Sequence, residues 1–246
     1  VEKEIEIARE SQFQLMPVAP PEIHGVDVFG FFIPSFEVGG DYFDYVVSTP
    51  NGSGEQCLTL AIVDVSGKAM KAAMHAVFTS GLLLSRMHRD EPAQILREVA
   101  PVLFQKTDSK TFITCQIARY CPNNGKLSLS NAGHCKPIIK RKGKADFLHL
   151  KEPRYPLGVN EQVAYNTMDL SIEKGDLVLF YSDGLPEASN GDNQRFGYEE
   201  TKKLIEQMDT DNMTSQEICR EIKRTIQRFS KFQLADDTTL VCLKPV

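Results

Sequence analysis

Two spacings of apolar residues alternate along this chain, and they predict where its strands and helices lie. Short apolar runs that end at glycine, proline or asparagine turns are typical of strands. They occur at Val26–Phe32, Tyr42–Val47, Leu58–Asp64, Thr111–Tyr120, Lys126–Ser130, Pro137–Lys140, Asp146–Leu150, Val163–Leu170, Asp176–Tyr181 and Thr238–Leu243. Helical spacing predicts helices at residues 1–16, Lys68–His88, Pro92–Gln105, Tyr198–Met208 and Ser215–Phe229.

The order of these segments predicts the fold class. The strands follow one another in antiparallel hairpins, and the helices are inserted in two pairs, so the strict alternation of a doubly wound sheet is missing. We therefore expect an α+β fold in which two stacked, largely antiparallel sheets carry helices on their outer faces. Because the helix at Lys68–His88 is apolar on most faces, we expect it to be buried, with its methionines in the core.

The first sixteen residues form an amphipathic segment of their own. Ile5, Ala8, Gln12 and Leu15 fall near one face, and Pro17 ends the helix. A helix this short needs a partner surface, either on its own domain or on another protein or copy. We expect residues 1–16 to be a linker or switch helix and residues 17–246 to be one globular domain.

The composition indicates which kinds of partner and which cellular compartment to expect. The formal net charge is −5, which provides no basic surface for nucleic acid. No signal peptide and no apolar run long enough to span a bilayer is visible, so we expect a cytoplasmic protein without membrane contact. The six cysteines form no CxxC pair, and we expect them to be reduced and structural: Cys57, Cys115, Cys121, Cys135, Cys219 and Cys242.

Carboxylates stand at the ends of several predicted strands. Asp64 ends one apolar run, Asp183 ends another, Asp236 precedes the last strand, and Asp41 opens a fourth. Taken alone, Asp64 is better explained as the N-cap of the helix that follows it; the recurrence of the pattern is what favours a shared site. A layered sheet could nevertheless bring all four to one edge, where oxygen ligands suit hard divalent cations. The five histidines are scattered along the chain, which argues against zinc.

Five motifs give the chain a family resemblance. They occur in the order and approximate spacing of bacterial metal-dependent serine/threonine phosphatases: Glu37–Asp44, Asp64–Lys68, Asn131–His134, Ser182–Ala188 and Asp236–Leu240. From about Glu4 to the C-terminus the chain resembles the stage II sporulation protein E and RsbU type of the protein phosphatase 2C (PPM) superfamily. Each motif alone is weak, but five in order are specific.

The resemblance implies a four-layer α-β-β-α sandwich that holds two Mn2+ or Mg2+ ions. Asp64 would bridge the ions, and the carbonyl of Val65 and the carboxylate of Asp41 would complete one site. Asp183 and Asp236 would hold the other ion. These four aspartates would be the catalytic set, and we expect Asp44 and Asp237 to lie in the shell of residues around the ligands.

The activity implied is hydrolysis of phosphoserine or phosphothreonine on a bacterial regulatory protein, typically an anti-sigma-factor antagonist. Two ions about 3.5 to 4 Å apart can acidify a bridging water and stabilise in-line displacement at phosphorus. By the same resemblance, the N-terminal helix would join an upstream sensor domain or form a homodimer. A catalytically inactive relative that only binds a partner is the alternative.

The chain departs from eukaryotic relatives at two positions. Ser66 stands where they carry a histidine, and Pro34–Val38 lacks their phosphate-binding arginine. The general acid and the phosphate anchor are therefore unassigned. For His134 we favour a structural role over a catalytic one, because a lone histidine is more often bound by its neighbours.

A thiol mechanism is the remote alternative. Cys135 and Arg141 have the Cys-x5-Arg spacing of cysteine-dependent phosphatases. That phosphate-binding loop needs successive backbone N–H groups, but Pro137 has none and Ile138-Ile139 favours an extended strand. We interpret the spacing as coincidence.

Overall fold

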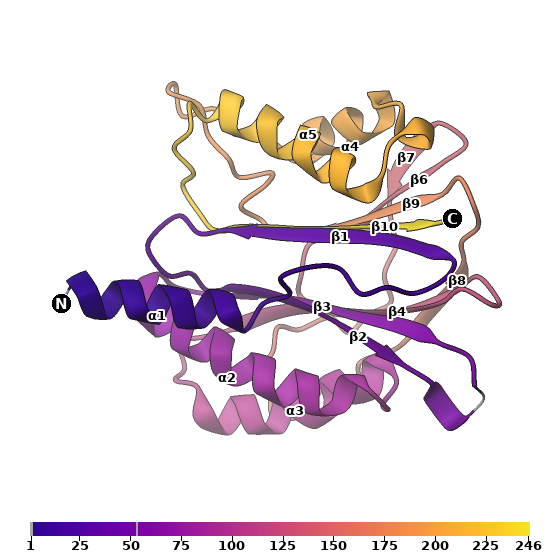
Figure 1. Cartoon of the computed structure of the whole chain (residues 1–246). Helices are drawn as coiled ribbons and strands as arrows, with labels where there is room; N and C mark the ends of the chain where they lie inside the picture. Colours follow the sequence, from indigo (N-terminus) through magenta and orange to yellow (C-terminus); the bar gives the residue numbers. More distant parts are fainter. Residues whose placement is uncertain (1, 53) are drawn as a thin grey trace.

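Two five-stranded antiparallel sheets pack face to face in the computed structural model, which describes residues 2–52 and 54–246 (Figure 1). One sheet has the order β1-β10-β9-β6-β7, with bounds Val26–Ile33, Thr238–Pro245, Leu177–Tyr181, Ile138–Arg141 and Lys144–Phe147. The other has the order β2-β3-β4-β5-β8, with bounds Asp41–Ser48, Cys57–Val65, Ile113–Cys121, Lys126–Ala132 and Met168–Ser171. The α+β class is confirmed.

Helices cover both outer faces of the sheet pair. α2 (Ala69–Met87) and α3 (Pro92–Lys106) pack on the sheet that contains β3, and α4 (Tyr198–Gln207) and α5 (Ser215–Phe229) pack on the other (Figure 1). This gives the expected α-β-β-α layering. Short 3-10 turns lie at Pro50–Gly52 and Thr210–Asn212. In the described ranges, no helix combines the length and the apolar character needed to cross a membrane.

The central strand β3 positions the candidate site. It lies between β2 and β4, and every residue of it is buried except Asp64, which is half-buried. A strand covered on both faces has a nearly continuous apolar sequence, which explains the run from Leu58 to Val63. The carboxylate of Asp64 therefore comes at the point where β3 leaves the core.

Several strand boundaries and one connection differ from expectation. β7 covers Lys144–Phe147 instead of Asp146–Leu150, and β8 begins at Met168, because residues 163–167 pair with no strand. β8 pairs with β5, whereas β9 pairs with β10 and β6. The turn at Lys174-Gly175 therefore carries the chain from one sheet to the other.

α2 buries a different face from the expected one. Ala72, Ala73 and Ala76 are buried, whereas Met70 is 41% and Met74 63% exposed. Small side chains let the helix approach β2 and β3 closely, so the longer methionines lie on the solvent side. The expectation that the α2 methionines lie in the core is wrong for Met70 and Met74.

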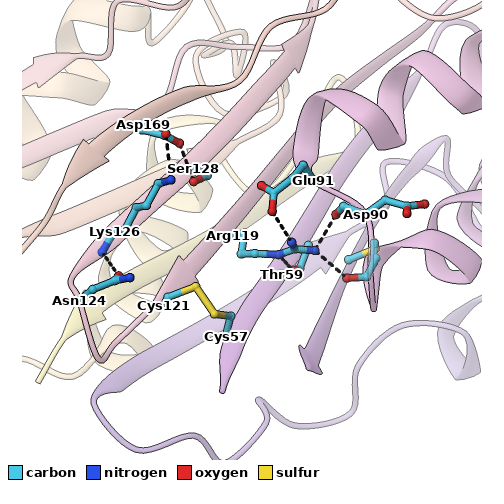
Figure 2. Close-up of a disulfide and its surroundings, with 11 residues drawn as sticks. Cys57, Thr59, Asp90, Glu91, Arg119, Cys121, Asn124, Lys126, Ser128 and Asp169 are labelled. Carbon is cyan, nitrogen blue, oxygen red and sulfur yellow. Dashed lines mark hydrogen bonds and ion pairs between the residues drawn. A yellow bond between two sulfur atoms is a disulfide. The ribbon is translucent and has the colours of Figure 1, made fainter. Parts of the chain in front are cut away.

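The prediction that all six cysteines are reduced is wrong for two of them. Cys57 and Cys121 form a disulfide (Figure 2). They stand directly opposite each other on β3 and β4, since the pairing of Leu58 with Tyr120 continues one step outward. No local pattern indicates this pair, because the two residues are 64 positions apart. Cys115, Cys135, Cys219 and Cys242 are free.

A buried arginine fixes the neighbouring part of β4. Arg119 is 3% exposed, and its Nε donates a hydrogen bond to Thr59 Oγ1 at 2.9 Å. Its Nη2 donates to the carbonyl of Asp90 at 2.6 Å, and its Nη1 pairs with Glu91 at 3.2 Å (Figure 2). These bonds tie β4 to the turn between α2 and α3. They lie toward the end of β3 opposite Asp64.

Candidate metal centre

Two of the predicted ligands face each other across a pair of strands. Asp41 is the first residue of β2, and its register partner on β3 is Asp64. Directly opposed residues of antiparallel strands place their side chains on the same face. Asp41 is 2% exposed, and its Oδ2 accepts hydrogen bonds of 2.6 Å from both Ser182 Oγ and Thr239 Oγ1. These hydroxyls come from the other sheet, so both aspartates face the space between the sheets.

The other two predicted ligands reach the same edge through adjoining loops. Ser182 N donates to the Thr239 carbonyl at 3.0 Å, which joins the end of β9 to the start of β10. Asp183 directly follows Ser182, and Asp236 lies just before β10. The structure thus brings together four segments that are widely separated in sequence.

Asp237 connects this edge to the loop before β2. Its Oδ2 accepts from Gly40 N at 2.7 Å, and its Oδ1 accepts from Ser35 N at 2.8 Å. A Cβ added at Gly40 would lie 2.8 Å from the carbonyl oxygen of Val65, so this carbonyl lies against the same loop. Asp237 therefore lies one residue from Asp236 and bonds to the loop that precedes Asp41; its place beside bound ions stays a prediction.

Asp44 is placed differently from the other predicted residues. Asp44 lies three positions after Asp41, so its side chain lies on the opposite face of β2. Its Oδ2 accepts a hydrogen bond of 2.5 Å from the Tyr42 hydroxyl, and Tyr42 lies close to Ser80 of α2. The structure therefore does not bring Asp44 to the carboxylate cluster.

The clustered carboxylates repel one another. Burial, followed by the charge of Asp237, raises the pKa of Asp41 well above its usual value. Burial and Asp41 do the same for the pKa of Asp64, and burial and Asp236 raise the pKa of Asp183. None of the ion pairs among the described residues involves Asp41, Asp64, Asp183 or Asp236. A cation would relieve this repulsion.

The donor chemistry fits hard divalent cations. Carboxylate and carbonyl oxygens are the ligands that Mg2+ and Mn2+ prefer, and the cluster contains no histidine or cysteine among its predicted ligands. In the parts of the chain that the structure describes, no three His, Cys, Asp or Glu side chains stand close enough together to hold an ion as they are oriented. The aspartates share an edge without forming a closed ligand shell.

A cleft of about 390 Å³ opens beside Asp64 and Asp183. His134 lies in its wall, 3% exposed, with Nδ1 2.8 Å from Thr114 Oγ1. Burial lowers the pKa of His134 to about 4, so its imidazole is neutral near pH 7. A neutral ring bound to Thr114 supports the structural role expected for His134.

Cys135 also lines the cleft, but its surroundings oppose a thiol mechanism. Burial and the charge of Asp183 raise the pKa of Cys135 to about 12, which keeps the thiol protonated. Ile138–Arg141 forms strand β6, and Arg141 binds Asp176 instead of facing a phosphate loop. The Cys-x5-Arg spacing therefore does not form a phosphate-binding loop here.

Sequence reasoning missed the polar groups that hold the site in place. Thr239 lies within the Asp236–Leu240 motif, but its bond to Asp41 was not predicted, and Thr114 lies in none of the five motifs. Arg154, which lines the cleft, lies in a segment without regular structure. Only strand register and loop packing reveal these contacts.

Comparison with known proteins settles the family. Residues 54–245 match the family model described as stage II sporulation protein E (SpoIIE), which covers most of the chain. The chain belongs to the SpoIIE family. Its similarity to a characterised member is distributed along the whole chain: the phosphoserine phosphatase RsbU of Bacillus subtilis (strain 168) is 28% identical over 99% of this chain and 70% of the relative.

Two solved structures share the fold. The SiaA-PP2C domain of Pseudomonas aeruginosa superposes with a TM-score of 0.81 at 17% identity, covering 99% of this chain and 96% of that one. RsbX, solved in complex with magnesium, superposes with a TM-score of 0.67 at 14% identity, covering 92% and 98%. At these identities the likeness concerns the architecture.

Proposed function

We propose that this SpoIIE-family domain is a metal-dependent protein phosphatase that hydrolyses phosphoserine or phosphothreonine on a bacterial regulatory protein. The observation that carries the proposal is that Asp41, Asp64, Asp183 and Asp236 approach one edge of the sheets without a pairing cation among the described residues, and that Asp64 and Asp183 line a cleft there. The similarity to a phosphoserine phosphatase supports the reaction type. An anti-sigma-factor antagonist is the proposed substrate class, by analogy with RsbU-type relatives.

The four aspartates and the Val65 carbonyl would hold Mn2+ or Mg2+, two ions in all. When bound, such ions supply Lewis-acid stabilisation of phosphoryl oxygens and acidify water. RsbX was solved with magnesium, which supports this choice of metal. The contribution of this chain's own residues is orientation: two hydroxyls fix the Asp41 carboxylate, and Asp237 fixes the loop at Gly40.

Substitution of single aspartates tests the proposal. We expect Asp64→Asn and Asp183→Asn each to weaken Mn2+ binding, measured by calorimetry, and to lower phosphate release from a phosphoserine protein by about a hundredfold. Asp211→Asn, at an exposed acidic position in the turn before α5, is the matched control and should change neither quantity.

Three outcomes would contradict the proposal in different ways. Turnover within a few-fold of the parent in both variants would exclude the aspartates as ligands. Activity that survives a chelator and disappears in Cys135→Ser would support the thiol mechanism. A parent that releases no phosphate with Mn2+ or Mg2+ but binds a regulator tightly would be the inactive binding module.

For the N-terminus we propose that residues 1–16 are a linker or switch helix, which joins an upstream sensor domain or mediates a homodimer. α1 spans Glu2–Gln14, and its buried residue Gln12 binds the backbone of Gly39, two positions before Asp41. A movement of α1 would therefore act directly on the loop that carries a predicted ligand.

A further inference from the structure

The cleft beside the carboxylates carries two cationic side chains that the proposed mechanism does not yet use. Arg154 and Lys136 both line it, together with Asp64 and Asp183. The loop before β2, where eukaryotic relatives carry a phosphate-binding arginine, has none between Pro34 and Val38. A phosphatase substrate brings a dianion into this cleft, and a carboxylate edge alone would repel it.

Arg154 is held rigidly by the Asn131–His134 turn. Its Nη1 donates to Asn131 Oδ1 at 3.0 Å and to the His134 carbonyl at 3.4 Å. The turn is itself closed by a 3.0 Å bond from His134 N to Asn131 Oδ1, and Asn131 is further fixed by Gln116. Since buried side chains hold the guanidinium in place, little further ordering is needed when an anion binds.

The other hydrogen-bond donors of the Arg154 guanidinium are available to a ligand. Its Nε donates to Glu152 Oε1 at 3.1 Å, and Glu152 is 72% exposed. An ion pair with so exposed a carboxylate contributes little stability, so a phosphate dianion can displace it. The bonds described use Nε and Nη1, and Nη2 takes part in none of them.

Lys136 supplies a second positive charge at the rim of the same cleft. It is exposed, and it forms no ion pair with the described residues. Lys136 lies two residues beyond His134, and Pro137, which follows it, favours an extended backbone at Lys136. A compact ammonium on a flexible stem suits a phosphoryl oxygen that arrives from solvent.

A buried hydroxyl in the cleft wall indicates that the cleft is built for a ligand. The hydroxyl of Tyr181 is buried and has no hydrogen-bond partner among the described residues, whereas the His134 ring interacts with the Tyr181 backbone. Buried polar groups are otherwise nearly always bonded, so unpaired ones beside an open cleft point to an absent polar partner.

We propose that Arg154 and Lys136 bind the phosphoryl group of the substrate, and that the Asn131–His134 turn serves to position Arg154. Phe147 and Tyr198, also in the cleft wall, would contact the apolar part of the residues next to the phosphorylated side chain. This inference rests on the proposed function and assigns its missing phosphate anchor. It also gives the Asn131–His134 motif a role in substrate binding.

Titration of Mg2+-loaded protein with inorganic phosphate tests the anchor without requiring turnover. We expect Lys136→Ala and Arg154→Ala each to raise the Kd for phosphate about tenfold or more, because each removes charge-assisted hydrogen bonds. Arg154→Lys keeps the charge but loses the planar fork, and its Kd should lie between those of parent and Arg154→Ala. Lys174→Ala, an exposed lysine in the turn between β8 and β9, is the control and should bind phosphate as the parent does.

Two further measurements distinguish an anion anchor from a structural effect. The Mn2+ affinity of each variant and the melting temperature of Lys136→Ala should match the parent, whereas Arg154→Ala also loses the bonds to Asn131 and His134 and should melt at a lower temperature. The KM for a phosphoserine peptide should rise with little change in kcat. Phosphate Kd values within twofold of the parent in both alanine variants would overturn the inference. So would a loss of Mn2+ affinity in Lys136→Ala. If the parent binds phosphate through these residues but does not hydrolyse the peptide, only the proposed function fails.

Discussion

Gly184 shows how a single residue keeps the candidate site compact. A Cβ at this position would overlap the carbonyl oxygen of Asp237, so the loop after Asp183 packs directly on the backbone before β10. The left-handed backbone that often requires glycine is not the reason here, since Gly184 is not among the residues with positive φ. Glycine is needed because two loops that carry predicted ligands touch.

From this contact we predict opposite effects on stability when Gly184 and Gly81 are each replaced by alanine. We expect Gly184→Ala to lower the free energy of unfolding by about 1 to 3 kcal/mol and to weaken Mn2+ binding, because the two loops must separate. Gly81→Ala is the matched control: this α2 residue has open space around it, and alanine should raise the free energy of unfolding by up to about 1 kcal/mol. Urea unfolding and calorimetry measure both. Equal stability of the two variants would contradict the packing argument.

Among the helices, α1 is joined most directly to the loop that precedes Asp41. Gln12 Nε2 donates to the Gly39 carbonyl at 2.6 Å, and Gly39 N donates to Gln12 Oε1 at 3.1 Å. One amide side chain thus satisfies both backbone groups of a buried glycine. The next residue, Gly40, is bound by Asp237, and Asp41 follows.

Removal of this side chain should loosen the loop. We expect Gln12→Ala to cost about 1 to 3 kcal/mol of stability, because it leaves two buried backbone groups unbonded, and to lower Mn2+ affinity several-fold. Faster amide exchange at Gly39 and Gly40 would report the loosening directly. Gln14→Ala, at an exposed position of the same helix, is the control. If deletion of residues 1–16 and Gln12→Ala both leave metal binding and oligomeric state unchanged, α1 is not a switch.

Across the whole molecule, stabilising contacts and candidate chemistry occupy opposite ends of β3. The Cys57–Cys121 disulfide closes one end of the β3–β4 pair, near the buried Arg119 (Figure 2). Asp64 stands at the other end of β3. Between the two ends, every residue of β3 is buried.

This separation predicts that stability and metal binding respond independently. We expect the double variant Cys57→Ala/Cys121→Ala to lose about 2 to 4 kcal/mol of unfolding free energy, because the bond closes a long loop in the unfolded chain. Its Mn2+ affinity should equal that of the parent. A reductant should destabilise the parent and leave the double variant unchanged. A matching loss of Mn2+ affinity would show that the ends of β3 are coupled.

The sequence determined the elements whose signals are local. The helix at Ser215–Phe229 was predicted to the residue, and its Thr214–Glu217 capping box is formed. The Lys142-Gly143 turn has the two left-handed residues that a tight hairpin requires. The order of strands and helices predicts the α+β class, which is confirmed, and the five ordered motifs nominate the four aspartates, whose role as ligands stays a prediction.

Only the tertiary structure decided which residues meet. It paired Cys57 with Cys121, turned Asp44 away from Asp41, exposed Met74 and brought Arg154 to the cleft. The physical reason is the distance along the chain between the residues that interact. Strands, caps and turns follow from backbone preferences of residues a few positions apart, whereas these contacts depend on strand register and on the close approach of two sheets. Those are settled by packing of the whole core.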